Sequence, residues 1–462
     1  MNDTQPPSSP FALNNIRMFI AFRVFFNARF YYPVFTILFL DFGLTLSQFA
    51  ILNAVWAGAI VLMEVPSGAL ADIWGRRNML IFSSLLMIVE LLLLCIVPLG
   101  NPTLLFAIFL VNRVLSGTAE AAASGADEAI AFDSLKEAGL TGEWSKVLAT
   151  QMRMRAIGRI FAMAVGAAVY DPVFMQRLMG WIGWQVSLTQ DVTLRFPIYL
   201  TLIMAFLTLY STLCMADPQS SLLSDECSDL ETCRLTVREI VLQTVGAGKW
   251  ILQTPFAMVI IAAGFLFDSI IRMAGTLASQ YYRLIEIPEA LFGIIGSGMA
   301  LIGIIIPRIA MKMVEQHTPR FNLLVVSTTT IVGLYGMTVF KPHYGLIPIV
   351  ILYSGGYMIG FFVSHYLNHI TESHQRATVL SFKGLFMNLF YGMIGLLYAF
   401  LITMLRPGIS EKYPHLVPEL LENLVFMQSF QWFPWTFVIG LSIFLVFAKY
   451  KLGSSSKEGE IR

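Results

Sequence analysis

The sequence predicts an all-α membrane protein with 12 transmembrane helices in two six-helix bundles. Of its 462 residues, 56% are hydrophobic and only 13% are charged, and the mean hydropathy is +0.70. Soluble domains carry about 25% charged residues. The apolar residues form repeated runs of about 20, the length that crosses a hydrocarbon core about 30 Å thick. Such long runs exclude a β-barrel, whose strands alternate in polarity with a short period.

Hydrophobic runs and helix breakers divide the chain into predicted spans and connections. Six spans are predicted near residues 15 to 40, 47 to 71, 78 to 98, 102 to 127, 146 to 170 and 196 to 215. A polar segment follows, and residues 235 to 252 are a predicted amphipathic helix at the membrane surface. Six more spans are predicted near 254 to 283, 289 to 311, 320 to 340, 344 to 370, 377 to 404 and 429 to 448. The expected parts are an N-terminal bundle (1–215), a cytoplasmic linker (216–252), a C-terminal bundle (253–450) and a cytoplasmic tail (451–462).

Lysine and arginine in the short loops predict the orientation, because positively charged loops stay on the cytoplasmic side. With both termini inside, the inner loops carry about twice as many of these residues as the outer loops. The N-terminus, MNDTQPPSSP, lacks the basic region and cleavage site of a signal peptide, so the first apolar run is expected to be a span. The longer outer connections, 171 to 195 and 406 to 430, have tryptophans within or just after them and are predicted interfacial helices.

Charge and cysteine content exclude several classes of protein. The net charge of +1 and the pI near 7.7 give no basic field, so nucleic acid is not an expected partner. The four cysteines are scattered and fit neither a disulfide framework nor a zinc site. No nucleotide-binding loop is present, so the energy for any transport must come from a gradient. We expect no metal and no cofactor.

The stretch GALADIWGRRNML, residues 68 to 80, falls in the predicted loop between spans two and three. Gly75 permits a tight turn there, and Gly68 allows the end of a helix to pack closely. Asp72 can cap a helix or pair with a base, while Arg76 and Arg77 anchor the loop. Loop charge alone would not require an acid and two glycines in this order.

This loop resembles the signature G-x-L-A-D-x-x-G-R-R/K of the major facilitator superfamily of transporters and matches it at every fixed position. The second signature, R-x-x-x-G in span four, has a counterpart from Arg113 to Gly117. The resemblance implies two bundles that rock about a midplane cavity, and a cytoplasmic gate at the signature loop. The implied gate residues are Gly68, Asp72, Gly75, Arg76 and Arg77, with Asp127 or Glu128 as acidic partners. The phrase EVPSG before the loop is similar to a bacterial subgroup, so we expect the bacterial cytoplasmic (inner) membrane.

Two departures from the family pattern refine this expectation. Proton-driven drug exporters usually show G-x-x-x-G-P-x-x-G-G in span five, whereas this chain has Gly158 and Gly166 without the proline and with Arg159 added. This departure makes a proton-driven drug exporter the less favoured function. The second-half copy of the loop signature, IPRIAMK from residue 306, lacks its glycine and aspartate, so an asymmetric gate is expected.

Ionisable side chains inside the spans are functional candidates, because each costs about 2.5–3.5 kcal/mol at a helix centre. For Arg113 two readings stay open, a base that faces the cavity and a static ion pair. Asp268 and Arg272 lie one helical turn apart and are expected to neutralise each other. Of the span-one arginines, one is expected to reach the membrane surface or to meet Glu64 or Glu90. The candidates are Arg23, Asn27, Glu64, Glu90, Arg113, Glu120, Arg159, Lys383 and Asn388, with Asp268, Arg272, His365 and His369 as weaker ones.

His365, His369 and Glu372 share one face of span ten at i, i+4 and i+7. The H-E-x-x-H arrangement of zinc enzymes is absent, so a gate contact or interfacial packing is favoured over a metal. A histidine that titrates near pH 6.5 could still sense protons.

Four functions are compatible with these features. The favoured one is a proton-coupled secondary transporter that moves a small organic solute by alternating access, and an anion is one candidate for that solute. We expect it to act as a monomer in the lipid bilayer. The second is an exporter of amphipathic drugs or metabolites, which 36 phenylalanines and 23 methionines would suit. A receptor that kept the fold and an intramembrane enzyme built on His365 and His369 rank below them, and we expect no enzymatic activity.

Overall fold

The computed structural model describes residues 9–217, 249–371 and 376–459, and the regular elements in these ranges are helices. The first half contains α1 (Asn14–Asn27), α2 (Phe35–Asp41), α3 (Leu46–Trp74), α4 (Arg76–Ile96), α5 (Pro102–Ala123), α6 (Ala126–Glu137), α7 (Trp144–Tyr170), α8 (Pro172–Trp181), α9 (Gln190–Thr193) and α10 (Phe196–Leu213). The second half contains α13 (Pro255–Thr276), α14 (Ala278–Leu284), α15 (Phe292–Gln316), α16 (Pro319–Met337), α17 (Leu346–Ile370), α18 (Arg376–Lys412), α19 (Pro418–Phe430) and α20 (Trp432–Gly459).

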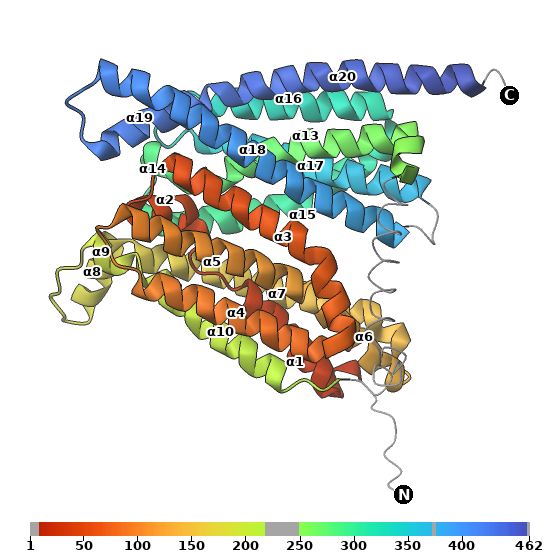
Figure 1. Ribbon diagram of the computed structural model, residues 1–462, viewed down its shortest axis with the longest axis horizontal. Helices are drawn as coiled ribbons and strands as arrows, with labels where there is room; N and C mark the ends of the chain where they lie inside the picture. The colour runs from red at the N-terminus through yellow and green to blue at the C-terminus, as the bar shows by residue number, and fades with distance from the viewer. Residues whose placement is uncertain (1–8, 218–248, 372–375, 460–462) are drawn as a thin grey trace, which may run out of the picture.

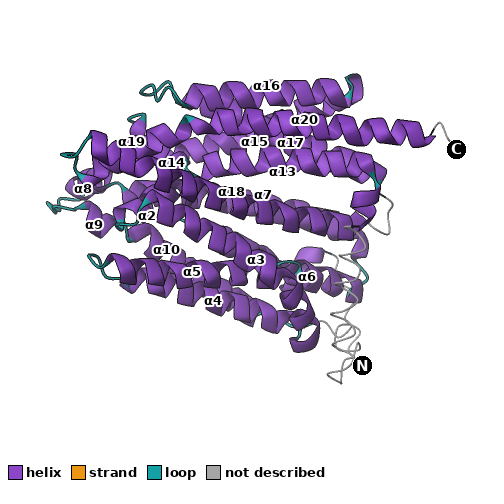
Figure 2. Cartoon of the chain, turned by 45° about the horizontal axis from the view of Figure 1, so that its top comes forward, coloured by secondary structure: helices purple, strands orange, loops and turns teal. Residues whose placement is uncertain are grey.

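The two halves of the chain lie side by side as separate groups of helices. Figure 1 shows α1 to α10 below and α13 to α20 above, and Figure 2 shows the same division. The start of α1, α6 and the end of α20 lie at one end, which we call the terminal side. At the opposite end lie α2, α8, α14 and α19, and we call this end the loop side.

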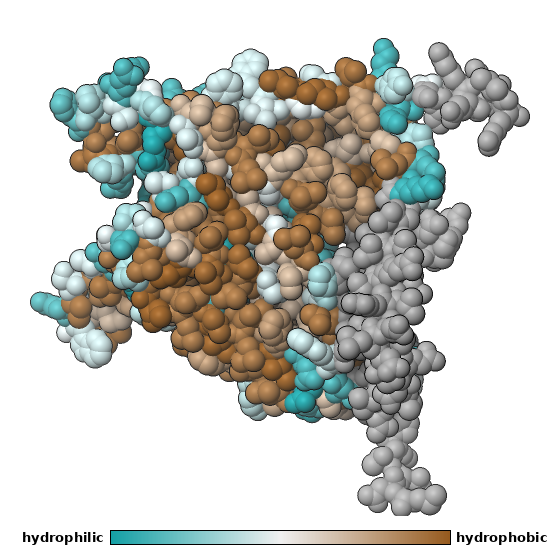
Figure 3. All heavy atoms as spheres, viewed as in Figure 1, coloured by the Kyte–Doolittle hydropathy of each residue, from teal (hydrophilic) through white to brown (hydrophobic). Residues whose placement is uncertain are grey.

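The described helices form an integral membrane protein. Nine helical segments in the described ranges are long and apolar enough to cross a membrane, or ten if α7 and α8, which meet at 88°, form one bent span. Large apolar side chains on their outer faces are exposed, among them Leu62, Ile96 and Phe400. Figure 3 shows the resulting apolar surface between more polar ends. A surface of this kind is stable against lipid and not against water.

The first predicted span differs from the structure, because it is broken. α1 ends at Asn27 and α2 begins at Phe35, with the 3-10 helix Tyr32–Val34 between them. Pro33 cannot donate a backbone hydrogen bond and disfavours a continuous α-helix across this point. The free backbone N–H of Phe30 instead donates to Thr201 Oγ1 at 3.1 Å. The seventh predicted span is likewise divided, at Leu277 between α13 and α14.

The signature loop is a tight turn between α3 and α4. Gly75 has φ of +86° and ends α3, which confirms the predicted glycine turn. The close packing predicted at Gly68 is not seen among the described residues, since α3 continues beyond it to Trp74 and a Cβ built on Gly68 would meet no described atom within 4 Å.

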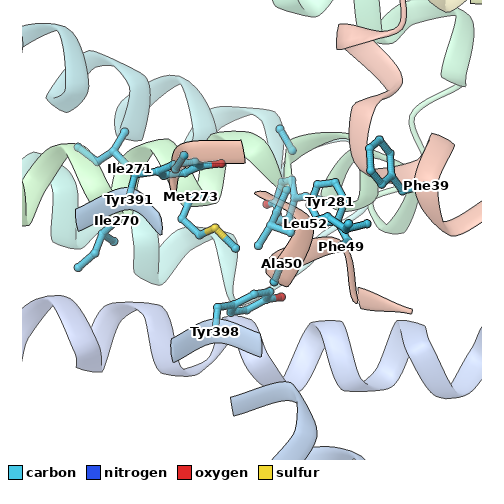
Figure 4. Packing of buried hydrophobic residues seen from close by; sticks show 14 of the residues in the cluster. Phe39, Phe49, Ala50, Leu52, Ile270, Ile271, Met273, Tyr281, Tyr391 and Tyr398 are labelled. Atoms are coloured by element: carbon cyan, nitrogen blue, oxygen red, sulfur yellow. The ribbon is translucent and has the colours of Figure 1, made fainter. Parts of the chain in front are cut away.

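The halves contact each other through α3 with α18 and α7 with α15. Gly392 and Gly395 of α18 face the backbone and small side chains of α3, including Ala50 and Ala54. Figure 4 shows Ala50 and Leu52 beside Tyr398 and Met273, so the core passes from one half to the other. These glycines allow α18 to pack closely on α3.

Three predicted segments have other outcomes. Most of the predicted surface helix, 235 to 252, lies outside the described residues. α20 continues into the predicted tail as far as Gly459. Of the predicted interfacial helices, α8 turns away from α7 by 88°, whereas α18 continues to Lys412 before α19 begins.

Candidate functional site

A cavity of about 900 Å³ lies between the two halves. The break after α1, together with α3, α5 and α7, forms its wall on the first half. α13, α14, α15, α17 and α18 form the opposite wall. Pockets of about 300–1,000 Å³ are typical of small-molecule sites, so the cavity has room for one small organic molecule.

Arg113 of α5 is the most deeply buried arginine on the cavity wall, with 4% of its surface exposed. Its guanidinium lies over the rings of Phe35 and Phe39, 5.3 and 5.2 Å from their centroids. Nε donates to Asn112 Oδ1 at 3.2 Å, but Nη2 has no hydrogen-bond partner among the described residues. No carboxylate in the described residues pairs with it, which favours the cavity-facing reading of Arg113 over the static ion pair.

α7 adds two further arginines, Arg155 and Arg159, to the same wall. They lie one turn apart on one helix face. Arg159 is exposed to the cavity, and its charge acts on Tyr353 and Tyr357 across it. The sequence analysis missed Arg155, although its i, i+4 spacing from Arg159 was a usable signal.

The second half contributes a neutralised pair to the cavity. Arg272 and Asp268 of α13 form the predicted ion pair, with Nη2 and Oδ2 3.2 Å apart. Arg272 also donates to Asn388 Oδ1 at 3.0 Å and lies 4.3 Å from the ring centroid of Tyr391. Asn388 therefore holds Arg272, while Lys383 lies outside the cavity lining.

A buried ion pair lies behind the first-half wall. Arg29 Nη1 and Glu90 Oε1 are 2.5 Å apart, and their side chains are 3% and 0% exposed. Contact with Glu90 was one of the alternatives that the sequence left open for a span-one arginine. Asn112 donates to the backbone carbonyl of Glu90 at 2.9 Å, which joins the pair to the residue beside Arg113. Tyr31, next along the broken segment, lines the cavity.

The implied acidic partners of the signature loop are not the ones in the structure. Arg76 pairs with Asp133 of α6, whereas Asp127 and Glu128 both pair with Arg23 of α1. The reason is geometric, because α6 begins directly after Gly125 and presents Asp127 and Glu128, in its first turn, toward α1 and Asp133 toward α4.

Two other parts of the loop can be compared with prediction. Arg77 anchors it as expected, since its backbone N–H donates to Asp217 Oδ1 and Nη2 to the carbonyl of Leu213. The side chain of Asp72 lies outside what the structure describes.

The remaining predicted residues do not line the cavity. Asn27 donates to the backbone of Arg23 one turn earlier, and Glu64 and Glu120 lie apart from the lining. His365 and His369 are exposed on a separate shallow pocket with Phe361. Glu372 is outside the described residues, and among those described no three ligands of a metal site come together.

A cluster that the sequence analysis missed closes the loop side of the cavity. Arg283 of α14 donates to both carboxylate oxygens of Asp41, at 2.8 and 2.7 Å, and pairs with Glu289. Tyr170 donates to Asp41 as well.

Backbone contacts complete this closure. Ser279 Oγ accepts from the backbone N–H of Thr36 at 3.0 Å, and Thr36 Oγ1 donates to the carbonyl of Thr276 at 2.6 Å. We call the contacts of Thr36 and Asp41 with Thr276, Ser279 and Arg283 the loop-side seal. Two further hydrogen bonds between the halves lie on the loop side of the cavity, from Ser47 Oγ to the carbonyl of Ala399 and from the backbone N–H of Ala290 to Asp171 Oδ2.

Comparison with known proteins agrees with this architecture. The model of the Major Facilitator Superfamily matches residues 17–399. No curated protein matches the chain. A bacterial homologue of the human lysosomal transporter Spinster, solved inward-facing and unoccupied, aligns with a TM-score of 0.68 and 14% identity over 97% of this chain and 98% of that one.

Two further solved structures share the fold. The nucleoside transporter NupG has a TM-score of 0.66 at 12% identity and covers 95% of this chain and 98% of its own. A D-xylose–proton symporter has a TM-score of 0.60 at 11% identity over 92% and 97%. These neighbours are transporters and not enzymes. With the family model matching most of its length, the chain belongs to the Major Facilitator Superfamily.

Proposed function

We propose that this protein is a secondary active transporter that moves a small organic anion across the membrane by alternating access. The observation that carries the proposal is Arg113, which is buried on the cavity wall with an unpartnered Nη2. A buried guanidinium without a carboxylate costs free energy, and an anionic ligand removes that cost by supplying the missing acceptor. Arg155 and Arg159 add positive charge to the same wall.

The loop charges support placing the terminal side in the cytoplasm of a bacterial inner membrane. The loop-side seal then closes the outer end, which corresponds to an inward-facing state. We propose that the bundles 1–215 and 253–450 rock about the cavity. Gly75, Arg76 and Arg77 then form the signature loop, with Asp133 as its acidic partner, and Arg23 with Asp127 and Glu128 forms a second link on the same side.

Proton coupling is part of the proposal. Asp268 lies on the cavity wall and is paired with Arg272, so protonating this carboxylate would release the guanidinium for an anion. The same fold in a D-xylose–proton symporter makes such coupling compatible with the architecture. A proton that binds with an anion also lowers the charge that must cross the low-dielectric core.

The test is transport by purified protein in proteoliposomes. A labelled aromatic carboxylate should accumulate when a pH gradient is imposed and should stop accumulating when a protonophore collapses it. Arg113→Gln should abolish uptake while the protein remains folded. Uptake of no anion from a broad panel, in either direction of the gradient, would refute the proposal.

One observation favours a second function, the export of amphipathic compounds. The cavity is lined by rings and thioethers as well as by arginines, including Tyr31, Trp56 and Met163. Such surfaces adapt to varied apolar ligands. Export predicts that deleting the gene sensitises a strain without redundant pumps to lipophilic cations, a result that anion transport does not predict.

A further inference from the structure

The charged residues on the cavity wall indicate more about the substrate than the sign of its charge. Resting on the proposed function, we infer that the substrate is a flat organic anion with two negative charges, one held by Arg113 and one by Arg159, and with an apolar body against the opposite wall. The inference combines a charge balance, the packing of the two arginines and open space at one glycine.

The charge balance begins with the groups that already have partners. Asp268 and Arg272 neutralise each other, as do Arg29 and Glu90. Arg23 is paired with two carboxylates, those of Asp127 and Glu128. The charge of Arg155 interacts with these two acids and with Arg23 and Arg159. Glu120, which lies outside the cavity lining, acts on Arg29 and Arg23.

The guanidiniums of Arg113 and Arg159 lie on the cavity wall and form no ion pair with a carboxylate among the described residues. A single negative charge would leave one of them uncompensated in a site of low dielectric. A ligand with two anionic groups compensates both, and each would gain charge-assisted hydrogen bonds.

The arginines differ in how they are held, which gives them different roles. Arg113 packs against the rings of Phe35 and Phe39, and its Nε is held by Asn112, so only Nη1 and Nη2 are available to an acceptor. Arg159 is exposed to the cavity and has no recorded hydrogen bond. We therefore expect Arg113 to orient one anionic group and Arg159 to adapt to the position of the second.

The wall opposite these arginines suits a flat apolar body. α17 places Tyr353 and Tyr357 on the cavity with Gly356 and Gly360 between and beside them. A Cβ built on Gly360 would have no atom within 4 Å, so this glycine faces open space. Aromatic rings stack well on such a surface of phenol rings and bare backbone.

The experiment measures binding of matched probes to the full-length protein in detergent by calorimetry. The probes are the three benzenedicarboxylates, benzoate, succinate and benzyltrimethylammonium. At least one benzenedicarboxylate should bind about tenfold or more tightly than benzoate, because it gains a second charge-assisted contact. It should also bind more tightly than succinate, which has the charges without the ring.

Variants test which arginine binds which anionic group of the ligand. Arg159→Gln should bring the affinity for the dianion down to that for benzoate and leave benzoate unchanged. Arg153→Gln, on the same helix but outside the cavity lining, is the matched control and should change neither. Gly360→Leu should weaken both aromatic probes and spare succinate. Arg113→Lys keeps the charge at the buried position and should retain part of the affinity, so that a failure of Arg113→Gln to fold does not decide the result.

The outcomes separate this inference from the proposed function. If benzoate binds as tightly as every benzenedicarboxylate and Arg159→Gln has no effect, the dianion is refuted while anion transport stands. If succinate matches the aromatic dianion, the flat body is refuted. If only benzyltrimethylammonium binds, both this inference and the proposed anion transport are wrong.

Discussion

Gly293, the second residue of α15, offers a direct test of the two-state mechanism. A Cβ built there would lie 2.0 Å from the backbone oxygen of Met163 and 2.7 Å from Cα of Ala164, both on α7 in the other half. Real Cβ atoms essentially never come within 3.0 Å of another heavy atom, and backbone cannot move aside as a side-chain end can. Gly293→Ala must therefore push α15 away from α7 at the loop side.

The added methyl group destabilises only the loop-closed state. Overpacking typically costs about 1–3 kcal/mol, and the cost applies only while the loop side is closed. A loop-open state separates α7 from α15 at this end and relieves the contact. Because about 1.4 kcal/mol corresponds to a factor of ten, the equilibrium should move about 5- to 150-fold toward the loop-open state.

The assay is a distance distribution across the loop side. Spin labels would be placed at Arg177 on α8 and Glu419 on α19, both exposed, in a background without the native cysteines. Gly293→Ala should lengthen the distance and increase the longer population. Gly298→Ala is the matched control, since a Cβ there meets nothing within 4 Å. An unchanged distribution in folded Gly293→Ala protein would refute the reasoning.

Three further predictions follow from single contacts. Glu90→Ala should lower the unfolding free energy by about 3–5 kcal/mol, since it leaves the Arg29 charge buried and unpaired, and adding Arg29→Met should restore part of the loss in thermal unfolding. Arg283→Gln removes the bidentate contact with Asp41 and should lengthen the same loop-side distance as Gly293→Ala, more strongly at low than at high salt. Gly166→Ala places a Cβ 1.8 Å from the backbone oxygen of Phe30 and should reduce the yield of folded protein in size-exclusion chromatography, whereas Gly180→Ala, in open space, should not.

The sequence was sufficient for features that depend on neighbours along the chain. The turn at Gly75 and the pair of Asp268 with Arg272 both follow from spacing within one segment. The family signature and the apolar runs also depend on sequence order alone. These features together predicted the fold class and two of the charged residues that line the cavity wall on the second half.

Features that depend on how separate helices meet were beyond the sequence. The partner of Arg76 is Asp133 and not Asp127 or Glu128, because the start of α6 at Gly125 decides which acid faces α4. The break in the first span was missed although Asn27, Arg29 and Pro33 interrupt its apolar run, because these residues do not reveal that Phe30 finds an acceptor on α10. The residues of the loop-side seal lie in three separate helices, α2, α13 and α14, and carry no common motif.

The two broken spans connect the cavity with the seal. The break after α1 places Tyr31 and Tyr32 on the cavity wall, and a few residues later Thr36 forms the seal. The break after α13 likewise joins the cavity to the seal, because Thr276 and Ser279 line the cavity and also contact Thr36. A ligand that contacts these segments therefore acts directly on the groups that close the loop side. A ligand shifts the equilibrium between the two states only if it binds them with different free energies. Because the same broken segments line the cavity and form the seal, a bound ligand should bind the loop-closed and loop-open states with different free energies. No separate pathway is needed between binding and closure, so substitutions at the breaks should alter affinity and the loop-side distance together.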